Sequence, residues 1–327
     1  MASYIIKRCL YLIPTLVVIS IVVFIVIQLP PGDYVTTYVM RLEQEGISVS
    51  QHRIEQMRSN YGLDQPMYIR YFKWITGVLR GDYGFSFEWN KPVAELIGAR
   101  LSLTIAVSLT SLIFTWLVSF VIGFYSATHQ YSLGDYFATT LGFVGLATPN
   151  FMIALVLMWF AYTKFGYTYG GLFSPEYAMA PWSLGKFFDL MKNLWLPVLV
   201  IGTSGTAGEI RILRANLLDE LAKPYVTTAR AKGVSGIKLI LKNPVRIALI
   251  PFVSTAGWRL SSLVSGSVVT ATVLNLPTTG PMLLQALKSQ DMYLAGSFIL
   301  FLSLLTVIGT LLSDILLAVL DPRIRYQ

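Results

Sequence analysis

The chain has 327 residues, of which 54% are hydrophobic and only 13% are charged, and its formal net charge is +8. Because a soluble domain usually carries about 25% charged residues, this composition excludes an ordinary soluble domain and indicates a membrane protein with several spans. The single cysteine, Cys9, excludes a disulfide framework within the chain. The surplus of Lys and Arg is expected in cytoplasmic loops and does not indicate nucleic-acid binding.

Apolar runs of about 20 residues, the length that a membrane-spanning helix needs, recur along the whole chain. They cover residues 9–29, 101–128, 136–163, 194–210, 247–274 and 296–320. The first run follows basic residues as a signal peptide would. It is too long for one, however, and QLPPGDY behind it lacks a small-residue cleavage pattern. We therefore expect an all-α integral membrane protein with six transmembrane helices, the first of them retained.

Basic residues predict the orientation of these spans. The segment 211–246 is rich in Lys and Arg and contains only Asp219 and Glu220 as acidic residues. Basic pairs also precede the first span (Lys7 and Arg8) and follow the last (Arg323 and Arg325). Because Lys and Arg concentrate in cytoplasmic loops, all three regions and hence both termini are expected inside.

These spans divide the chain into three predicted parts. They are an N-terminal span at residues 1–30, an external helical segment at 31–100 and a core of five further spans at 101–327. The core contains an external insertion at 164–193, expected to be an ordered loop followed by a short helix, and the cytoplasmic loop 211–246.

Helical patterns recur in the external segment 31–100. Ser50 can cap a helix that starts at Gln51 and ends before Gly62. Further on, apolar residues share one predicted helix face: Tyr68, Tyr71, Phe72, Ile75, Val78 and Leu79. This pattern predicts either a helix that lies at the membrane interface or a surface on which an external partner docks.

Two charged residues stand out inside the spans. Arg259 lies near the middle of the fifth span, where a charge costs at least about 2.5 kcal/mol. Such a residue normally faces the bundle interior or water and has a partner. Glu209, near the inner end of the fourth span, is the nearest candidate. A structural ion pair and a charge that lines a transport pathway are both open. Asp314 in the last span is expected to be an anchoring residue near the cytoplasmic end.

Small residues in the fourth and fifth spans predict close helix packing, since packing in lipid depends on small side chains. They are Gly202, Gly205 and Gly208 in the fourth span and Gly257, Ser261 and Ser265 in the fifth. We expect these residues to have a structural role in preference to a contact with a transported solute.

No pattern in the sequence indicates an enzyme. The chain has no G-x-x-x-x-G-K-[ST] nucleotide-binding loop and no G-x-S-x-G motif in a suitable context. His52 and His129 fall on opposite sides of the membrane in the predicted topology, so they cannot share a metal ion. We expect no catalytic residue, no metal and no cofactor in this chain.

A short basic segment, YVTTARAKGVSG, lies in the cytoplasmic loop 211–246. Pro224 suits the first position of a helix and Gly233 suits its end, which predicts a helix of about nine residues. A helix this short is not stable alone in water, so it must dock on another surface. Residues Tyr225, Thr228, Ala229 and Lys232 share one face of it. Anionic lipid is one candidate for that surface, but the small Thr/Ala face fits a protein groove better. Ser235 can cap a further helical piece that Pro244 ends.

TTARAKG resembles the coupling motif of ABC importer permeases, which is Glu-Ala-Ala followed by a glycine. The dipeptide/oligopeptide/nickel permease family is similar over nearly the whole chain. The matching pieces, in family order, are YGLDQPMYIRYFKWITGVLRGDYGFS, PVAELIGARLSLTIAVS, ATPNF, YVTTARAKG, ALIP and LDPRIR. The resemblance implies the type I ABC importer permease fold in a bacterial inner membrane. It also implies partners: a second homologous permease, two cytoplasmic ATPases that bind ATP and Mg²⁺, and an external solute-binding protein.

The resemblance also assigns residues. Thr227, Thr228 and Ala229 take the Glu-Ala-Ala positions and Gly233 the glycine; Tyr225, Arg230 and Lys232 complete the contact with the ATPase. A second region, Pro277, Thr278, Thr279 and Gly280, corresponds to the external gate and scoop loop. The chain departs from the family pattern at Thr227, at Ala271, where Glu is usual, and at Thr278, where Gly is usual.

The resemblance implies alternating access driven by the ATPases, with an oligosaccharide or an oligopeptide as solute. The LPTTGP variant and the insertion before LWLP favour an oligosaccharide, and nickel is the least favoured solute because no His or Met cluster lines the spans. A secondary transporter is the alternative. It predicts inverted repeats and broken spans with ion ligands, and the sequence shows neither, apart from Pro14 and Pro149. A purely structural scaffold would leave the short cytoplasmic helix without a purpose.

Overall fold

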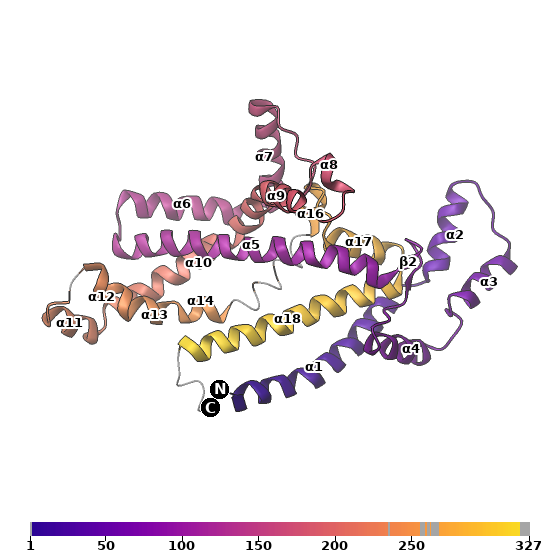
Figure 1. Cartoon of the computed structure of the whole chain (residues 1–327), viewed down its shortest axis with the longest axis horizontal. Coiled ribbons are helices and arrows are strands. Elements are labelled where there is room, and N and C mark those ends of the chain that lie inside the picture. Colours follow the sequence, from indigo (N-terminus) through magenta and orange to yellow (C-terminus); the bar gives the residue numbers. More distant parts are fainter. Residues whose placement is uncertain (1, 235, 256–258, 260–261, 263–267, 321–327) are drawn as a thin grey trace. The chain divides into compact units, whose positions relative to one another are not determined.

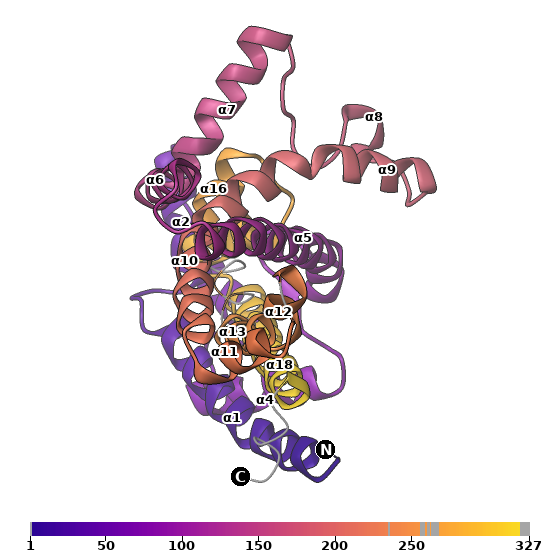
Figure 2. The same cartoon turned by 90° about the vertical axis from the view of Figure 1, so that its left-hand side faces the viewer.

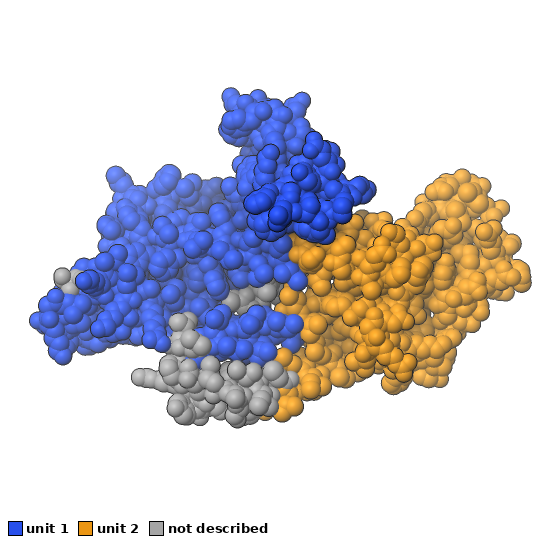
Figure 3. Space-filling view, viewed as in Figure 1, with its two compact units in different colours: residues 1–8, 105–277, 306–327 blue, residues 9–104, 278–305 orange. Residues whose placement is uncertain are grey.

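The computed structural model describes residues 2–234, 236–255, 259, 262 and 268–320 (Figure 1). Within these residues the secondary structure is helical apart from one antiparallel hairpin, β1 (Phe85–Ser86) with β2 (Lys91–Pro92). The chain forms two compact units, coloured separately in Figure 3. Unit 1 comprises residues 1–8, 105–277 and 306–327, and unit 2 comprises residues 9–104 and 278–305.

Four helices in the described part of the chain are long and apolar enough to cross a membrane. They are α1 (Ala2–Gln28), α5 (Val93–Thr128), α10 (Trp195–Leu221) and α18 (Met292–Leu320). Each covers or extends one predicted span, namely the first, second, fourth and sixth. Pro14 lies inside α1 without ending it.

The third predicted span is broken in two, so the expectation of one continuous helix over residues 136–163 is wrong. Helix α6 (Leu133–Ala147) and helix α7 (Asn150–Phe165) meet at an angle of 105°, and both Figures 1 and 2 show α7 turning away from α6. Thr148, the residue before Pro149, has extended backbone angles. Proline disfavours helical geometry in the residue before it and cannot donate a backbone hydrogen bond, which explains the break.

The fifth predicted span is described only in part. Its beginning consists of the short helices α13 (Pro244–Ala248) and α14 (Ile250–Ser254), and its end is helix α16 (Val268–Val273). Gly257, Ser261 and Ser265 lie outside the described residues. The described part of the chain therefore holds four candidate spans, or five if the bent α6–α7 pair counts as one.

Unit 2 holds the helices α3 (Gln51–Asn60) and α4 (Met67–Leu79), which the sequence patterns predict, and a further helix, α2 (Tyr34–Gln44), which they do not. Helix α3 begins after Ser50 as expected, although the Ser50 side chain makes no capping hydrogen bond. In α4 the predicted apolar face divides into two. Trp74 is buried together with Tyr71, Ile75 and Val78, whereas Tyr68, Phe72 and Leu79 are exposed. The residues of the first group therefore face the unit. The exposed group, Tyr68, Phe72 and Leu79, forms a second apolar face that suits a membrane interface.

A buried carboxylate joins the hairpin of unit 2 to the start of α18. Asp291 is fully buried and accepts hydrogen bonds from the Ser86 hydroxyl (2.5 Å) and the Glu88 amide (3.2 Å). Its other oxygen accepts from the Leu294 amide in the first turn of α18 (3.3 Å). Helix α17 (Thr279–Lys288) packs beside these elements through Met282 and Ala286. One side chain therefore connects the hairpin to the start of α18.

Unit 1 is built around α10, which contacts α6, α7, α13 and α14. Small residues permit these contacts. A Cβ on Gly142 of α6 would lie 3.3 Å from Ala207, and a Cβ on Gly202 would lie only 2.5 Å from the Phe114 ring of α5. The Thr115 hydroxyl donates to the Gly202 carbonyl at 2.9 Å. Gly202 therefore serves helix packing, as expected from its size.

The insertion 164–193 forms helices α8 (Pro175–Ala178) and α9 (Leu184–Asn193) after an ordered loop, as predicted. Asp189 of α9 accepts hydrogen bonds from the amide (2.7 Å) and the hydroxyl (2.6 Å) of Ser174. These bonds hold the loop against the helix, so the insertion is a folded part of unit 1.

Candidate functional site

The segment 211–246 contains the predicted short helix, α11 (Pro224–Ala231), followed by α12 (Gly236–Lys242); both lie at one end of unit 1 (Figure 1). Pro224 occupies the first turn of α11. Gly233 has φ +86°, its amide donates to the Arg230 carbonyl (3.0 Å), and the Val234 amide donates to the Ala229 carbonyl (3.1 Å). These two bonds form a Schellman motif, which needs a left-handed residue at the position of Gly233. The predicted limits of the helix are confirmed.

Helix α11 is attached to the unit by one apolar and one polar contact. Val226 is only 1% exposed. The Tyr225 hydroxyl donates to a Glu220 carboxylate oxygen at 2.9 Å, and Lys223 forms an ion pair with the other oxygen of the same carboxylate. Burial, together with this hydrogen bond, raises the pKa of Tyr225 to about 12, so the hydroxyl stays a neutral donor. The sequence analysis did not predict the burial of Val226 or the contact of Glu220 with Tyr225; the only signal was that Asp219 and Glu220 are the acidic residues of the otherwise basic segment 211–246.

The opposite surface of α11 is open. Thr227, Thr228, Arg230 and Lys232 are exposed, and Ala229 is half-buried. The Thr228 hydroxyl donates to the Pro224 carbonyl at 3.0 Å, which leaves its methyl group on the surface. The exposed surface is therefore narrow, formed by small side chains and flanked by positive charge.

Helix α12 leads from α11 into the interior of unit 1. It ends at Lys242, and Pro244 begins α13. The expectation that Pro244 only ends a helix is therefore incomplete, because the first helical position tolerates proline. Two residues of α13, Val245 and Ala248, belong to one buried cluster with Leu213 and Leu217 of α10. Helix α13, which follows α11 and α12 in the chain, is thus part of the packing of α10.

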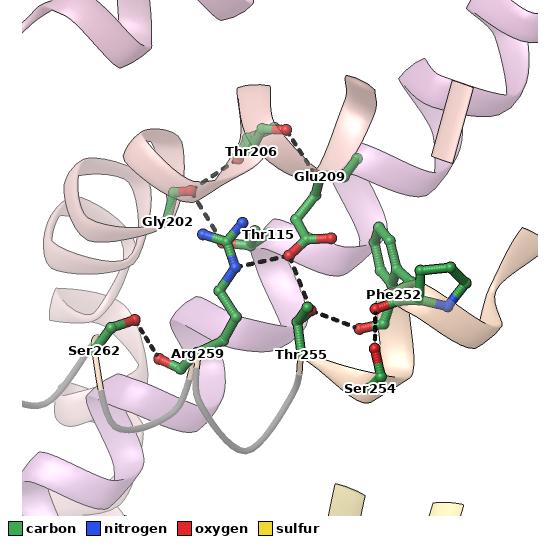
Figure 4. A network of polar contacts seen from close by, with 11 residues as sticks. Thr115, Gly202, Thr206, Glu209, Phe252, Ser254, Thr255, Arg259 and Ser262 are labelled. Atoms are coloured by element: carbon green, nitrogen blue, oxygen red, sulfur yellow. Dashed lines mark hydrogen bonds and ion pairs between the residues drawn. The ribbon is translucent and has the colours of Figure 1, made fainter. Parts of the chain in front are cut away.

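Glu209 and Arg259 form the predicted ion pair, shown in Figure 4. The Arg259 Nε atom lies 2.7 Å from the Glu209 Oε1 atom, and the Glu209 side chain is fully buried. The Thr255 hydroxyl donates to the same oxygen at 3.4 Å. Two glycines of α10 leave room for the guanidinium, because a Cβ on Gly205 or Gly208 would lie 3.2 or 3.3 Å from its nitrogen atoms. These glycines serve the ion pair. A role of the pair in a transport pathway stays a prediction.

The predicted gate and scoop residues are not an exposed loop. Thr278 caps α17, and Thr279 and Gly280 form its first turn; all three are buried, whereas Pro277 is half-buried. The Thr279 amide donates to the Thr104 hydroxyl at 2.9 Å, and that hydroxyl lies 3.1 Å from the Thr279 hydroxyl. Buried hydrogen bonds hold these residues in place, and their gating role stays a prediction.

Asp314 is half-buried in α18. Across the part of the chain that the structure describes, no group of three or more His, Cys, Asp or Glu residues is arranged to hold a metal ion. The candidate site therefore combines α11, which has one open side, with the buried Glu209–Arg259 ion pair; both are bonded to α10, an arrangement that can transmit movement.

Two family models together cover most of the chain. Residues 119–326 match the model described as binding-protein-dependent transport system inner membrane component, and residues 1–110 match the N-terminal model for membrane components of such systems. The chain is 35% identical to the oligopeptide transport system permease protein AppB of Bacillus subtilis over 330 residues. It is 32% identical over 327 residues to the glutathione transport system permease protein GsiC of Salmonella typhimurium and of Escherichia coli.

The similarities to these permease proteins extend over the full length of both chains. This shows the type I ABC permease fold and a multi-pass inner-membrane protein that transports and does not catalyse a reaction. Such a permease works with an ATPase and a solute-binding protein. The chain belongs to the family of inner-membrane permease components of binding-protein-dependent ABC import systems.

Proposed function

We propose that this chain, together with one homologous permease, two ATPase subunits and an external binding protein, imports a peptide. The proposal rests on α11. One side of this helix is attached to unit 1 through Val226 and Tyr225, and the other side exposes a face of small side chains. ATP and Mg²⁺ belong to the ATPase partners, and this chain binds no cofactor. The residues proposed to contact the ATPase are Tyr225, Thr227, Thr228, Ala229, Arg230, Lys232 and Gly233.

The solute is proposed from the names of the relatives. One relative is named for oligopeptide transport and the other for glutathione, which is itself a small peptide. Both names favour the peptide over the oligosaccharide.

The proposed mechanism uses the packing of unit 1. Movement of an ATPase displaces α11, and the Tyr225–Glu220 bond passes this displacement to α10. The cluster of Val245 and Ala248 with Leu213 and Leu217 provides a second connection through α13. Because α10 also carries Glu209, its displacement moves Arg259 and thereby the fifth span. Rigid elements that shift together in this way are a common route for switching transitions.

Orientation is proposed from charge. The end of unit 1 that contains α11 and α12 is rich in Lys and Arg, so it and both termini face the cytoplasm. Residues 31–100, the insertion 164–193 and the Pro277–Gly280 gate region then face outward.

The orientation is tested by labelling introduced cysteines in a Cys9→Ser background. Met179 is 98% exposed in the insertion 164–193, and Lys238 is exposed on α12. A membrane-impermeant thiol reagent is expected to label Met179→Cys in intact cells, and Lys238→Cys only after the membrane is opened. The reverse pattern contradicts the proposed function, because α11 could not then meet an ATPase.

The contact of α11 with the ATPase is tested by Gly233→Val. A Cβ at this position meets no atom within 4 Å, so the change strains only the left-handed backbone, at a cost of about 1–2 kcal/mol. We expect the complex to assemble and to bind its binding protein, while stimulation of ATP hydrolysis by the loaded binding protein is largely lost.

Gly81→Val is the matched control, because Gly81 has φ +82° and an equally open surrounding in the external segment. It is expected to retain stimulation. Normal stimulation in Gly233→Val, or an equal loss in both variants, contradicts a specific coupling role for the end of α11.

The ion pair is tested by one single and one double substitution. Arg259→Leu leaves Glu209 buried without its charged partner, which typically costs about 3–5 kcal/mol, so we expect poor assembly and little transport. Arg259→Lys retains part of both. Because removing both charges is often tolerated, Arg259→Leu combined with Glu209→Leu is expected to restore assembly and part of transport. Assembly without any transport in the double variant would instead assign the pair to the transport pathway.

A further inference from the structure

A cavity of about 280 Å³ lies between α6 and α10, in the half of α10 that leads to the cytoplasmic loop. Its polar lining consists of Tyr131, Asp135, Tyr136, Thr139, Arg211 and Arg214. None of these residues belongs to the contact surface of α11 or to the Glu209–Arg259 pair. The cavity is therefore a separate feature of unit 1.

The cavity carries one surplus positive charge. Arg214 donates two hydrogen bonds to Asp135, at 2.9 and 3.2 Å, and the Asp135 carboxylate also accepts from the Tyr131 amide at 3.0 Å. This pair is internally neutral. Arg211 lies over the Phe143 ring at 5.3 Å from its centre. In the described ranges of the chain, no carboxylate lies within ion-pair distance of Arg211.

An apolar hollow adjoins this charged one. A second cavity of about 160 Å³ is lined by Phe114, Val118 and Ile122 of α5 and by Leu141 and Gly145 of α6. The two cavities share the contact line of α6 with α10, namely Ala138, Gly142, Ala207 and Ile210. Beside them α6 presents exposed Phe137, Leu141 and Val144 to its surroundings. The charged and hydroxyl groups of the first cavity thus lie next to the apolar second cavity and the exposed apolar residues of α6.

We propose that this cavity binds the phosphate headgroup of an anionic phospholipid, with the acyl chains lying along the apolar face of α6. An arginine guanidinium matches phosphate oxygens in geometry and charge, and basic pockets between transmembrane helices on the cytoplasmic side are suited to anionic headgroups. Arg211 supplies the charge, and the neighbouring tyrosine and threonine hydroxyls supply further hydrogen-bond partners. Assignment to the inner leaflet rests on the proposed orientation.

The test uses the complete purified transporter in detergent and a phosphatidylglycerol probe with a photoreactive diazirine in one acyl chain. We expect crosslinks on α6 and α10 around the cavity. Arg211→Gln should lower this labelling about fivefold, the contribution of one basic residue at an anionic surface, whereas Arg211→Lys should retain most of it. Lys238→Gln removes one positive charge on the same side of the protein and should leave the labelling unchanged.

Four outcomes would overturn the proposal. If a phosphatidylcholine probe labels the protein as strongly as the phosphatidylglycerol probe, the headgroup charge is not recognised. The same conclusion follows if the wild type and Arg211→Gln are labelled equally. Complete competition by soluble glycerol phosphate would assign the cavity to a free phosphate compound. A disulfide between Thr139→Cys and a cysteine introduced into the second permease would show that a protein covers the cavity. Each of these results leaves the orientation and coupling experiments unaffected, so failure here is distinguishable from failure of the proposed function.

Discussion

A helix of eight residues cannot persist in water through its own hydrogen bonds, because nucleation costs more than so few bonds return. Helix α11 therefore exists only because the rest of unit 1 holds it. Val226 buries one side of it, Tyr225 binds Glu220 at the end of α10, and Gly233 closes its last turn. Its other side is open in the described residues, and this is the surface proposed to meet the ATPase.

Helix α10 connects the contacts of α11 with those of α13 and Arg259. Helix α10 carries Glu209 near its middle, the packing surface for α13 one to two turns later, and the anchor of α11 near its end. Gly205 and Gly208 leave room for the Arg259 guanidinium, and a side chain at either position would force the guanidinium to move. A displacement at the end of α10 beside α11 is therefore difficult to absorb locally, since close-packed interiors shift between discrete arrangements and do not deform continuously.

Features encoded by nearby residues were predictable. The ends of α11 follow from Pro224 and Gly233, because both residues act through their own backbone geometry. Glu209 was a reasonable partner for Arg259, since a charge at that depth requires one. The contact of Tyr225 with Glu220 was not predictable, because it depends on the angle at which α11 leaves α10. That angle is set by Val226 and by the packing of α13.

The two prolines show where local reasoning ends. Pro14 lies within a continuous α1, whereas Pro149 separates α6 from α7 by a bend of 105°. Both prolines remove a backbone donor, so a proline permits a break in a helix without requiring one. At Pro149 the two helices that meet, α6 and α7, both contact α10. A broken span is also a feature of secondary transporters. The bend alone therefore does not decide between the two classes of transporter, and the family relationship does.

The central proposal is that α10, α11 and α12 move as one body during the ATPase cycle. Spin labels at Ala215 on α10 and Lys238 on α12, both exposed, report their separation in the assembled transporter by pulsed electron resonance. The account predicts the same distance distribution in the nucleotide-free and the ATP-trapped complex, while labels on the two ATPases show that they have closed. A change of the α10–α12 distance upon closure would show that the movement is absorbed within unit 1 and would contradict the account.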